Sequence, residues 1–238
     1  VNFAAAGELP GYDKALFVNR RAIFSQGFYD PLAQAVAGLI REHTGDRSGE
    51  AVVLDAGCGE GFYTAFLSRQ PELQGKLRLI GVDLCRDAIA MAPQYNVRAG
   101  WCVADLVQLP LAAQSVDILL DILTPANYRE FGRLLKKDGI LIKVIPARDY
   151  LAEIRDAVKA GLQQKEYSNQ AVVDYSKEHI HLLKRQEVCY RRPVTPEQAA
   201  AFFRMTPLTG HIRPEGLPGG GIKQITIHME ILVGRIRQ

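Results

Sequence analysis

Three glycines at alternate positions follow a short apolar segment in the first quarter of the chain. Gly57, Gly59 and Gly61 come after the run 51–54 and the acid Asp55, and apolar residues at helical spacing come next. A strand, a glycine turn and a helix start form the arrangement in which a nucleotide-like ligand lies against the backbone. Glycine lets the chain bend sharply and lets a ligand approach without a Cβ in the way. The segment therefore predicts a cofactor site.

Asp55 narrows the class of ligand that this turn suits. A dinucleotide site more often shows G-x-G-x-x-G, and an acid directly before the turn would lie beside the pyrophosphate. A cofactor that carries positive charge and an amino group suits an acid there better. The alternative is that Asp55 is an ordinary acid at the end of a strand on a Rossmann sheet.

Two further acids stand at the ends of the next predicted strands. Asp83 ends the run 77–83, about 20 residues after the glycine turn, where an acid accepts hydrogen bonds from a ribose diol. Asp105 follows the predicted strand 97–103, where an acid can meet the amino group of adenine. The residues that follow these acids are assigned to the same site: Leu84 and Leu106.

The motif D-x-G-C-G-E-G-x-Y at Asp55 to Tyr63 resembles the first motif of class I S-adenosylmethionine-dependent methyltransferases. The flanking segments resemble those of bacterial 23S rRNA guanine-N1 methyltransferases, and the likeness extends over nearly the whole chain. These segments are R-R-A-I-F-S-Q-G-F-Y-D-P-L at 20–32, L-P-L at 109–111, T-P at 124–125 and M-T-P at 205–207. The resemblance implies S-adenosyl-L-methionine as cofactor and a guanine of 23S rRNA as methyl acceptor.

Apolar runs that alternate with helical segments predict an α/β fold with a parallel sheet. The resemblance specifies it as the Rossmann-like class I methyltransferase fold, with a seven-stranded, mostly parallel sheet and an antiparallel last strand. Residues 1–48 are expected to form an arm and helices that cover the cofactor site, and residues 49–238 the methyltransferase domain. The remaining expected strands are 116–122, 140–145, 182–190 and 225–233. The expected helices include 14–24, one capped by Asp30, 127–135, 150–164 and one from a Thr195 capping box to Met205, with a turn at 136–139.

The loop after the fourth strand is where this fold places groups that face the methyl acceptor. Asp121, Thr124 and Asn127 are therefore the candidates for holding a base edge. Guanine N1 carries a proton, and Asp121 is the candidate acceptor for it. Asp121 can equally be a strand-end acid that pairs with a nearby Lys or Arg. Tyr29 is a candidate cofactor contact, or a hydrophobic staple before the second helix.

Composition sets few limits on function. The chain has 238 residues and a formal net charge of +3, which permits a nucleic-acid partner without arguing for one. No apolar run reaches the roughly 18 residues of a membrane span, and the start of the sequence shows no secretory signal. We expect a cytoplasmic protein, with RNA as its substrate and a homodimer as one possible assembly.

No metal site is expected. Four scattered cysteines without a C-x-x-C pair offer no zinc site. The two histidines His179 and His181 lack further recognisable ligands. The related rRNA enzymes carry an N-terminal zinc ribbon, and this sequence leaves open whether a ribbon precedes Val1 or was lost.

Three rival functions remain. The first is a small-molecule methyltransferase of the same fold. The second is a non-catalytic module that binds the cofactor or RNA. The third is a nicotinamide-dependent oxidoreductase, which Asp55 and an antiparallel closing strand pair disfavour.

Overall fold

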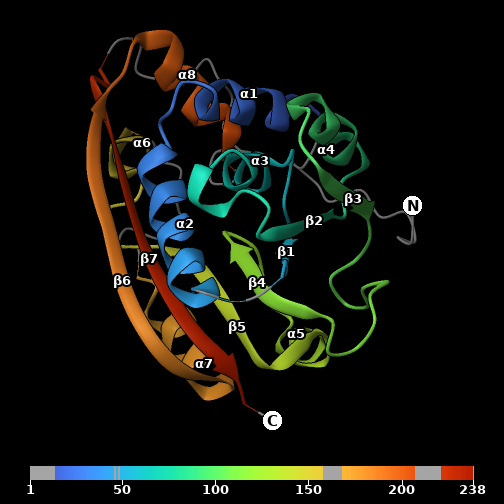
Figure 1. Cartoon of the computed structure of the whole chain (residues 1–238). Coiled ribbons are helices and arrows are strands. Elements are labelled where there is room, and N and C mark those ends of the chain that lie inside the picture. The colour runs from blue at the N-terminus through green and yellow to red at the C-terminus, as the bar shows by residue number, and fades with distance from the viewer. Residues whose placement is uncertain (1–13, 46, 48, 158–167, 207–220, 238) are drawn as a thin grey trace.

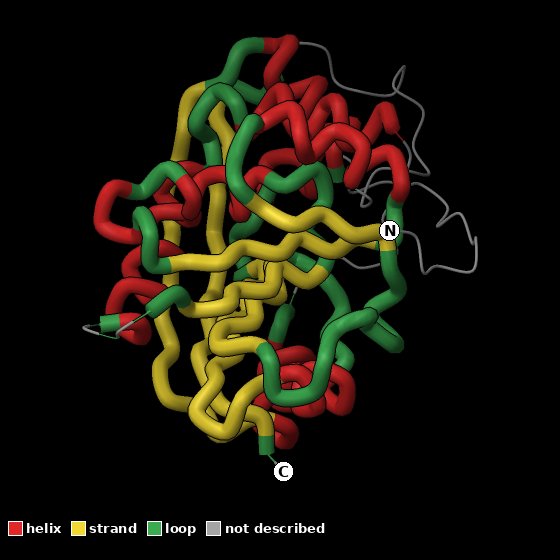
Figure 2. Tube along the Cα trace, turned by 45° about the vertical axis from the view of Figure 1, so that its right-hand side comes forward, coloured by secondary structure: helices red, strands yellow, loops and turns green. Residues whose placement is uncertain are grey.

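A single seven-stranded sheet with helices on both faces forms the body of the protein (Figures 1 and 2). The computed structural model describes residues 14–45, 47, 49–157, 168–206 and 221–237. The strands are β1 (Ala51–Ala56), β2 (Leu77–Asp83), β3 (Ala99–Val103), β4 (Val116–Ile122), β5 (Leu135–Pro146), β6 (Ile180–Pro193) and β7 (Gln224–Ile236). The helices are α1 (Lys14–Phe24), α2 (Asp30–Thr44), α3 (Phe62–Ser68), α4 (Arg86–Met91), α5 (Tyr128–Leu134), α6 (Ala152–Ala157), α7 (Gln170–His179) and α8 (Pro196–Met205), with 3₁₀ turns η1 (Pro71–Leu73) and η2 (Ala92–Tyr95).

The strand order is β3-β2-β1-β4-β5-β7-β6. Strands β1 to β5 pair in parallel, and β7 is antiparallel to both of its neighbours, β5 and β6. Six strands therefore run one way and the last strand runs against them, which confirms the predicted fold. Because parallel strands end at the same edge, the loops after β1, β2 and β4 meet there, and ligands of such sheets bind at that edge.

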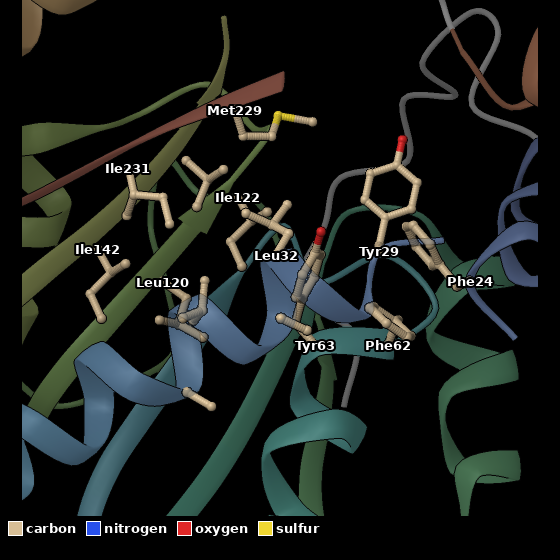
Figure 3. Packing of buried hydrophobic residues seen from close by; sticks show 14 of the residues in the cluster. Phe24, Tyr29, Leu32, Phe62, Tyr63, Leu120, Ile122, Ile142, Met229 and Ile231 are labelled. Carbon is tan, nitrogen blue, oxygen red and sulfur yellow. The ribbon is translucent and has the colours of Figure 1, made fainter. Parts of the chain in front are cut away.

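Alternate residues of β4 enter two different cores, as expected for a strand covered on both faces. Ile118 and Leu120 pack with α1, α2, α3 and α8, whereas Val116 and Leu119 pack with α5 and α7. Figure 3 shows the first of these cores, whose labelled members include Leu32 of α2, Leu120 and Ile122 of β4, and Ile142 of β5. Two phenylalanines of α3 also belong to it, Phe62 as a buried member and Phe66 as a partly buried neighbour.

Several predicted boundaries were wrong. The predicted turn at 136–139 lies inside β5, because the ladder to β4 shifts between the pairs Val116–Leu135 and Ile118–Ile140 and takes up the extra residues as a bulge. Helix α7 was not predicted, since only Val173 and Ser176 of its ten residues are buried and the apolar stripe is weak. Strand β6 extends beyond the predicted 182–190, and β3 begins at Ala99 rather than Val97.

Of two predicted helix caps, the structure confirms the one at Thr195 and contradicts the one at Asp30. Thr195 and Gln198 form the predicted capping box of α8, with Pro196 in its first turn. The predicted cap Asp30 is instead the first residue of α2, and Tyr29 stands at the cap position without a side-chain bond to the backbone. The predicted helix 150–164 begins at Ala152 and is described to Ala157. Residues 1–13, the rest of that helix and most of the loop 214–221 lie outside the described residues.

Within the described part of the chain, no helix combines the length and the apolar character needed to cross a bilayer.

Gly81 in the middle of β2 makes room for the only tryptophan of the chain. A Cβ added at Gly81 would lie 2.6 Å from Cε3 of Trp101 and 3.0 Å from Sγ of Cys58. The same ring would lie 2.6 Å from a Cβ at Gly61, the residue that caps the start of α3. The indole of Trp101 therefore packs against both β2 and the glycine turn, and this contact requires that Gly61 and Gly81 have no Cβ.

We predict that Gly81→Ala lowers the free energy of unfolding by about 1–3 kcal/mol, because the Trp101 ring must move out of a packed core. Gly38→Ala is the matched control. Gly38 lies in α2 with nothing within 4 Å of an added Cβ, so this change is expected to raise the free energy of unfolding by about 0.5–1 kcal/mol. Urea unfolding of both variants checks the pair, and an unchanged midpoint for Gly81→Ala would contradict the packing argument.

Candidate active site

A cavity of ≈ 620 Å³ opens at the carboxyl edge of the sheet. The glycine turn after β1 and the loop after β4 form two of its walls, and residues of α1, β5 and α7 complete it. It brings together many predicted site residues with others that were not predicted. Its lining includes Arg20, Tyr29, Asp55, Gly57, Gly59, Glu60, Tyr63, Thr124, Lys143 and Tyr150.

The glycine turn adopts the left-handed backbone that its residue types favour. Gly57, Gly59 and Gly61 have φ angles of 75°, 57° and 88°, which side chains with a Cβ rarely adopt. Asp83 braces the turn from the neighbouring strand, since its Oδ2 accepts the N–H of Gly59 at 2.8 Å and its Oδ1 accepts that of Cys85 at 2.8 Å. The turn is therefore preformed by the end of β2.

Three carboxylates crowd this turn, and we name Asp55, Glu60 and Asp83 the acidic cluster. Burial raises the pKa of Asp55 to about 7. The hydrogen bond from Thr64 opposes this rise, and the negative charge of Asp83 adds to it. Burial also raises the pKa of Glu60 to about 7, against the opposing charge of Arg20. Burial likewise raises the pKa of Asp83. Packed acids with raised pKa values favour the binding of a cation.

Helix α1 lies across the same turn. A Cβ at Gly59 would lie 3.2 Å from Cε1 of Phe17 and 3.9 Å from Nη1 of Arg20. The guanidinium of Arg20 also opposes the rise of the Glu60 and Asp83 pKa values. The charge of Arg20 thus acts on the acidic cluster. Arg20 belongs to residues 1–48, the segment that was expected to cover the cofactor site.

Two tyrosines, Tyr29 and Tyr63, lie together in the wall of the cavity. Tyr29 and Tyr63 both pack against Phe24, with ring centroids 4.8 and 6.1 Å away (Figure 3). The Tyr29 hydroxyl shares a hydrogen bond of 2.7 Å with that of Tyr150. The Tyr63 hydroxyl is buried and has no hydrogen-bond partner among the described residues. A buried hydroxyl without a partner is costly, so Tyr63 is a candidate ligand contact.

At the acceptor end, Asp121 and Lys143 form a buried ion pair. Lys143 Nζ donates to Asp121 Oδ2 at 2.6 Å and to the carbonyl oxygen of Thr124 at 3.2 Å. Burial raises the pKa of Asp121 to about 6, and the charge of Lys143 opposes this rise. Asp121 is fully buried, whereas Lys143 lines the cavity. The structure therefore shows Asp121 in a pair with lysine, the alternative that the sequence left open.

The other two acceptor candidates lie in different surroundings. Thr124 lines the cavity and sits over the glycine turn, since its Cβ would be 2.9 Å from a Cβ at Gly57. Asn127 caps α5, because its Oδ1 accepts the N–H of Glu130 at 3.2 Å. Its Nδ2 donates to the carbonyl of Leu106 at 3.1 Å, which ties α5 to the loop after β3.

The nucleoside end of the predicted site lies beside the cavity rather than in its wall. The predicted cofactor-binding residues that do not line it are Gly61, Asp83, Leu84, Asp105 and Leu106. Asp105 is exposed, and its Oδ1 accepts the N–H of Val107 at 2.9 Å. These residues keep their predicted positions at the ends of β2 and β3, and their contact with a cofactor stays a prediction.

Sequence reasoning missed Glu60, Tyr63 and Lys143. Glu60 and Tyr63 stand inside the motif that suggested the cofactor, and Tyr63 is its last residue. Lys143 is the single charge inside the apolar run 140–145. A charge in the middle of a buried strand must have a partner, and this signal was available in the sequence.

The residues present fit S-adenosylmethionine, which carries a sulfonium and an ammonium group. The acidic cluster provides the negative charge, the left-handed turn provides close backbone approach, and the Tyr63 hydroxyl provides an unused polar group. No group of three potential metal ligands occurs among the described residues.

We predict that Tyr63→Phe weakens the binding of S-adenosylhomocysteine by about 1 kcal/mol while the ligand-free protein keeps or gains stability, because the hydroxyl has no partner to lose. The matched control Tyr29→Phe removes the bond to Tyr150 and is expected to lower the stability of the ligand-free protein by about 1 kcal/mol. Calorimetric titration and urea unfolding measure the two effects. Equal ligand affinity in Tyr63→Phe and the wild type would exclude the contact.

We predict that affinity for S-adenosylmethionine rises from about pH 6 to about pH 8, because Asp55 and Glu60 lose protons near pH 7 and a cation prefers their ionised forms. In the ligand-free protein the sign is opposite. The raised pKa values stabilise the fold at low pH, and this contribution is lost as the pH rises through about 7. Titrations at both pH values test this, with Asp55→Asn as the control that flattens the dependence. A constant affinity would contradict it.

The chain is similar in sequence to known methyltransferases. Residues 53–139 match a methyltransferase domain family. A protein of Bacillus subtilis (strain 168), named "Putative 23S rRNA (guanine-N(1)-)-methyltransferase YxjB", is 33% identical over 98% of this chain and 84% of its own length. The 23S rRNA (guanine(748)-N(1))-methyltransferase of Streptomyces fradiae is 26% identical over 91% of this chain and 78% of its own length.

Solved structures show the same fold at lower identity. The geranyl diphosphate C-methyltransferase of Streptomyces coelicolor A3(2), solved with S-adenosyl-L-homocysteine, aligns with a TM-score of 0.52 at 13% identity, over 85% of this chain and 76% of that one. The PH0226 protein of Pyrococcus horikoshii OT3 aligns with a TM-score of 0.54 at 16% identity, over 88% of this chain and 91% of that one. The chain therefore belongs to the class I methyltransferases, which use S-adenosylmethionine as cofactor, and to the family that includes the proteins named as 23S rRNA (guanine-N1)-methyltransferases.

Proposed function

We propose that the protein methylates N1 of a guanine in 23S rRNA. The structural observation that carries the proposal is Lys143, a lysine that lines the cavity and is held by Asp121 and Thr124. The names of the relatives that align along most of the chain support the same substrate. An enzyme with this substrate would work in the cytoplasm, beside the ribosome.

Guanine N1 is a lactam nitrogen that carries a proton. When the proton leaves, negative charge spreads onto the neighbouring carbonyl oxygen O6. A fixed cation beside that oxygen stabilises this charge in a site from which water is excluded. Lys143 has one N–H left after it donates to Asp121 and Thr124, and that N–H is available for O6.

Asp121 acts through Lys143 in this proposal. Its carboxylate holds the ammonium group in place, and Thr124 anchors the same group through its carbonyl oxygen. The proton of N1 passes to water. The bound cofactor supplies a methyl group that is already activated by its sulfonium, so the protein mainly positions the base and excludes solvent.

The direct test is methyl incorporation. The protein is incubated with cofactor labelled in the methyl group and with 23S rRNA in one reaction, and with a metabolite extract in another. Label in the RNA that digestion identifies as 1-methylguanosine supports the proposal. Label in a small molecule alone would favour the small-molecule rival, and cofactor binding without any labelled product would favour the non-catalytic rival.

We predict that the double variant Asp121→Asn/Lys143→Met loses about 100-fold in the rate of methyl transfer, because the charge on O6 loses its cation. Removing both charges avoids leaving one of them buried alone. Affinity for S-adenosylhomocysteine is expected to stay unchanged, since the hydrogen bonds of Lys143 go to Asp121 and Thr124 and not to the acidic cluster.

Lys143→Arg is the conservative control and should keep part of the rate, because the cation remains. The residual rate of the double variant should also rise more steeply with pH than that of the wild type, since solvent must then remove the N1 proton without help. A double variant with the wild-type rate and pH profile would refute the role of Lys143.

A further inference from the structure

A second, smaller recess has a strongly basic wall that the cofactor site does not use. It has a volume of ≈ 250 Å³ and lies where α5 meets the start of β5 and the end of β7. Figure 1 shows α5 and the carboxyl end of β7 at the same end of the molecule. We name it the basic recess; the cations that line it are Arg129, Lys136, Lys137, Arg235 and Arg237.

Few of these charges are balanced by carboxylates. Lys136 pairs with the buried Asp117 at 2.8 Å, but Asp117 also pairs with Arg47. Arg235 lies 3.6 Å from Asp138, which is longer than a hydrogen bond, and the Asp138 side chain is 83% exposed.

Three cations of the recess have no carboxylate partner in the described part of the chain. The nearest acid to Arg129 in sequence is Glu130, and both of its oxygens are taken by Arg133. Arg237 Nε donates to a neutral acceptor, the carbonyl oxygen of Ile180, at 3.1 Å. Lys137 is exposed and forms no ion pair among the described residues. An exposed recess with this excess of positive charge raises the local concentration of anions.

The fold brings these cations together through one close contact. A Cβ at Gly132 in α5 would lie 3.1 Å from Cγ2 of Ile236 in β7. The missing side chain lets α5 lie directly against the end of β7. Arg129, one turn before Gly132, therefore shares the recess with Arg235 and Arg237 on either side of Ile236.

One residue connects the recess with the cavity. Tyr128, the first residue of α5, lines both, although the recess lies at the start of β5 and the cavity at its end. A substrate that reaches from one to the other must carry negative charge outside the group that enters the cavity. A nucleic-acid strand fits this description, because each nucleotide carries a phosphate that Arg and Lys can bind.

We propose that the basic recess binds phosphate groups of the RNA backbone while the target base occupies the cavity; this rests on the proposed function. The recess then fixes the register of the RNA and contributes affinity that does not depend on sequence. The neighbouring ammonium and guanidinium groups supply the hydrogen-bond donors for phosphate oxygens.

The test compares RNA binding by Arg129→Ala/Lys137→Ala with that by the wild type and by Lys76→Ala, an exposed lysine outside both pockets. Fluorescence anisotropy with a labelled 23S rRNA transcript is recorded over a series of salt concentrations. In the double variant we expect the dissociation constant to rise about tenfold and the slope of log K against log salt to fall by about 2, roughly one unit for each lost contact. Lys76→Ala should match the wild type, and all three should bind S-adenosylhomocysteine equally.

The outcomes separate the two proposals. A double variant with wild-type affinity and salt slope would overturn the phosphate site, whether or not the RNA is methylated. A reduced slope without any methylated RNA would retain the recess as an RNA contact and remove the proposed function. Calorimetric titration with inorganic phosphate is the last arm. Phosphate binding that the double variant loses, together with an unchanged RNA slope, would assign the recess to a small anion and overturn the RNA assignment.

Discussion

The structure depends on one electrostatic constraint, the gathering of two buried carboxylates, Asp55 and Glu60, and the partly buried Asp83 at the bend after β1. Burial raises the pKa values of Asp55 and Glu60 to about 7, so the ligand-free protein holds them in an unfavourable state. Asp83 must stay beside them, because it accepts the N–H groups that shape the glycine turn. We expect a cationic ligand to relieve this repulsion, so that the site prefers a sulfonium cofactor to a pyrophosphate.

The cavity wall holds both negative and positive charge. Asp55 and Glu60 of the acidic cluster belong to β1 and the turn after it, and Lys143 belongs to β5, with β4 between them. Both charges are positioned by the same sheet, since β1, β4 and β5 are neighbours in register and end at one edge. In the proposed reaction the oxygen of the methyl acceptor faces Lys143. The sheet fixes the separation of this cation from the acids before any ligand enters.

Features that follow from local sequence were predictable, and features that depend on distant partners were less so. The strand, turn and helix around Asp55 and the capping box at Thr195 each depend on residues a few positions apart. The bulge in β5 and helix α7 depend on tertiary packing, because their own apolar patterns are weak. At the site, Asp121 was recognised, but its pairing with Lys143 was left open, since 22 residues separate them and only the parallel pairing of β4 with β5 brings them together.

The most direct measurement is a calorimetric titration of the ligand-free protein at about pH 8 with S-adenosylmethionine, S-adenosylhomocysteine and NAD in turn. The acidic cluster predicts that the first two bind at one site per chain, that Asp55→Asn reduces the preference for the sulfonium form, and that NAD gives no heat of binding. Saturable binding of NAD, or an equal preference for the two sulfur forms with and without the Asp55 charge, would contradict the account.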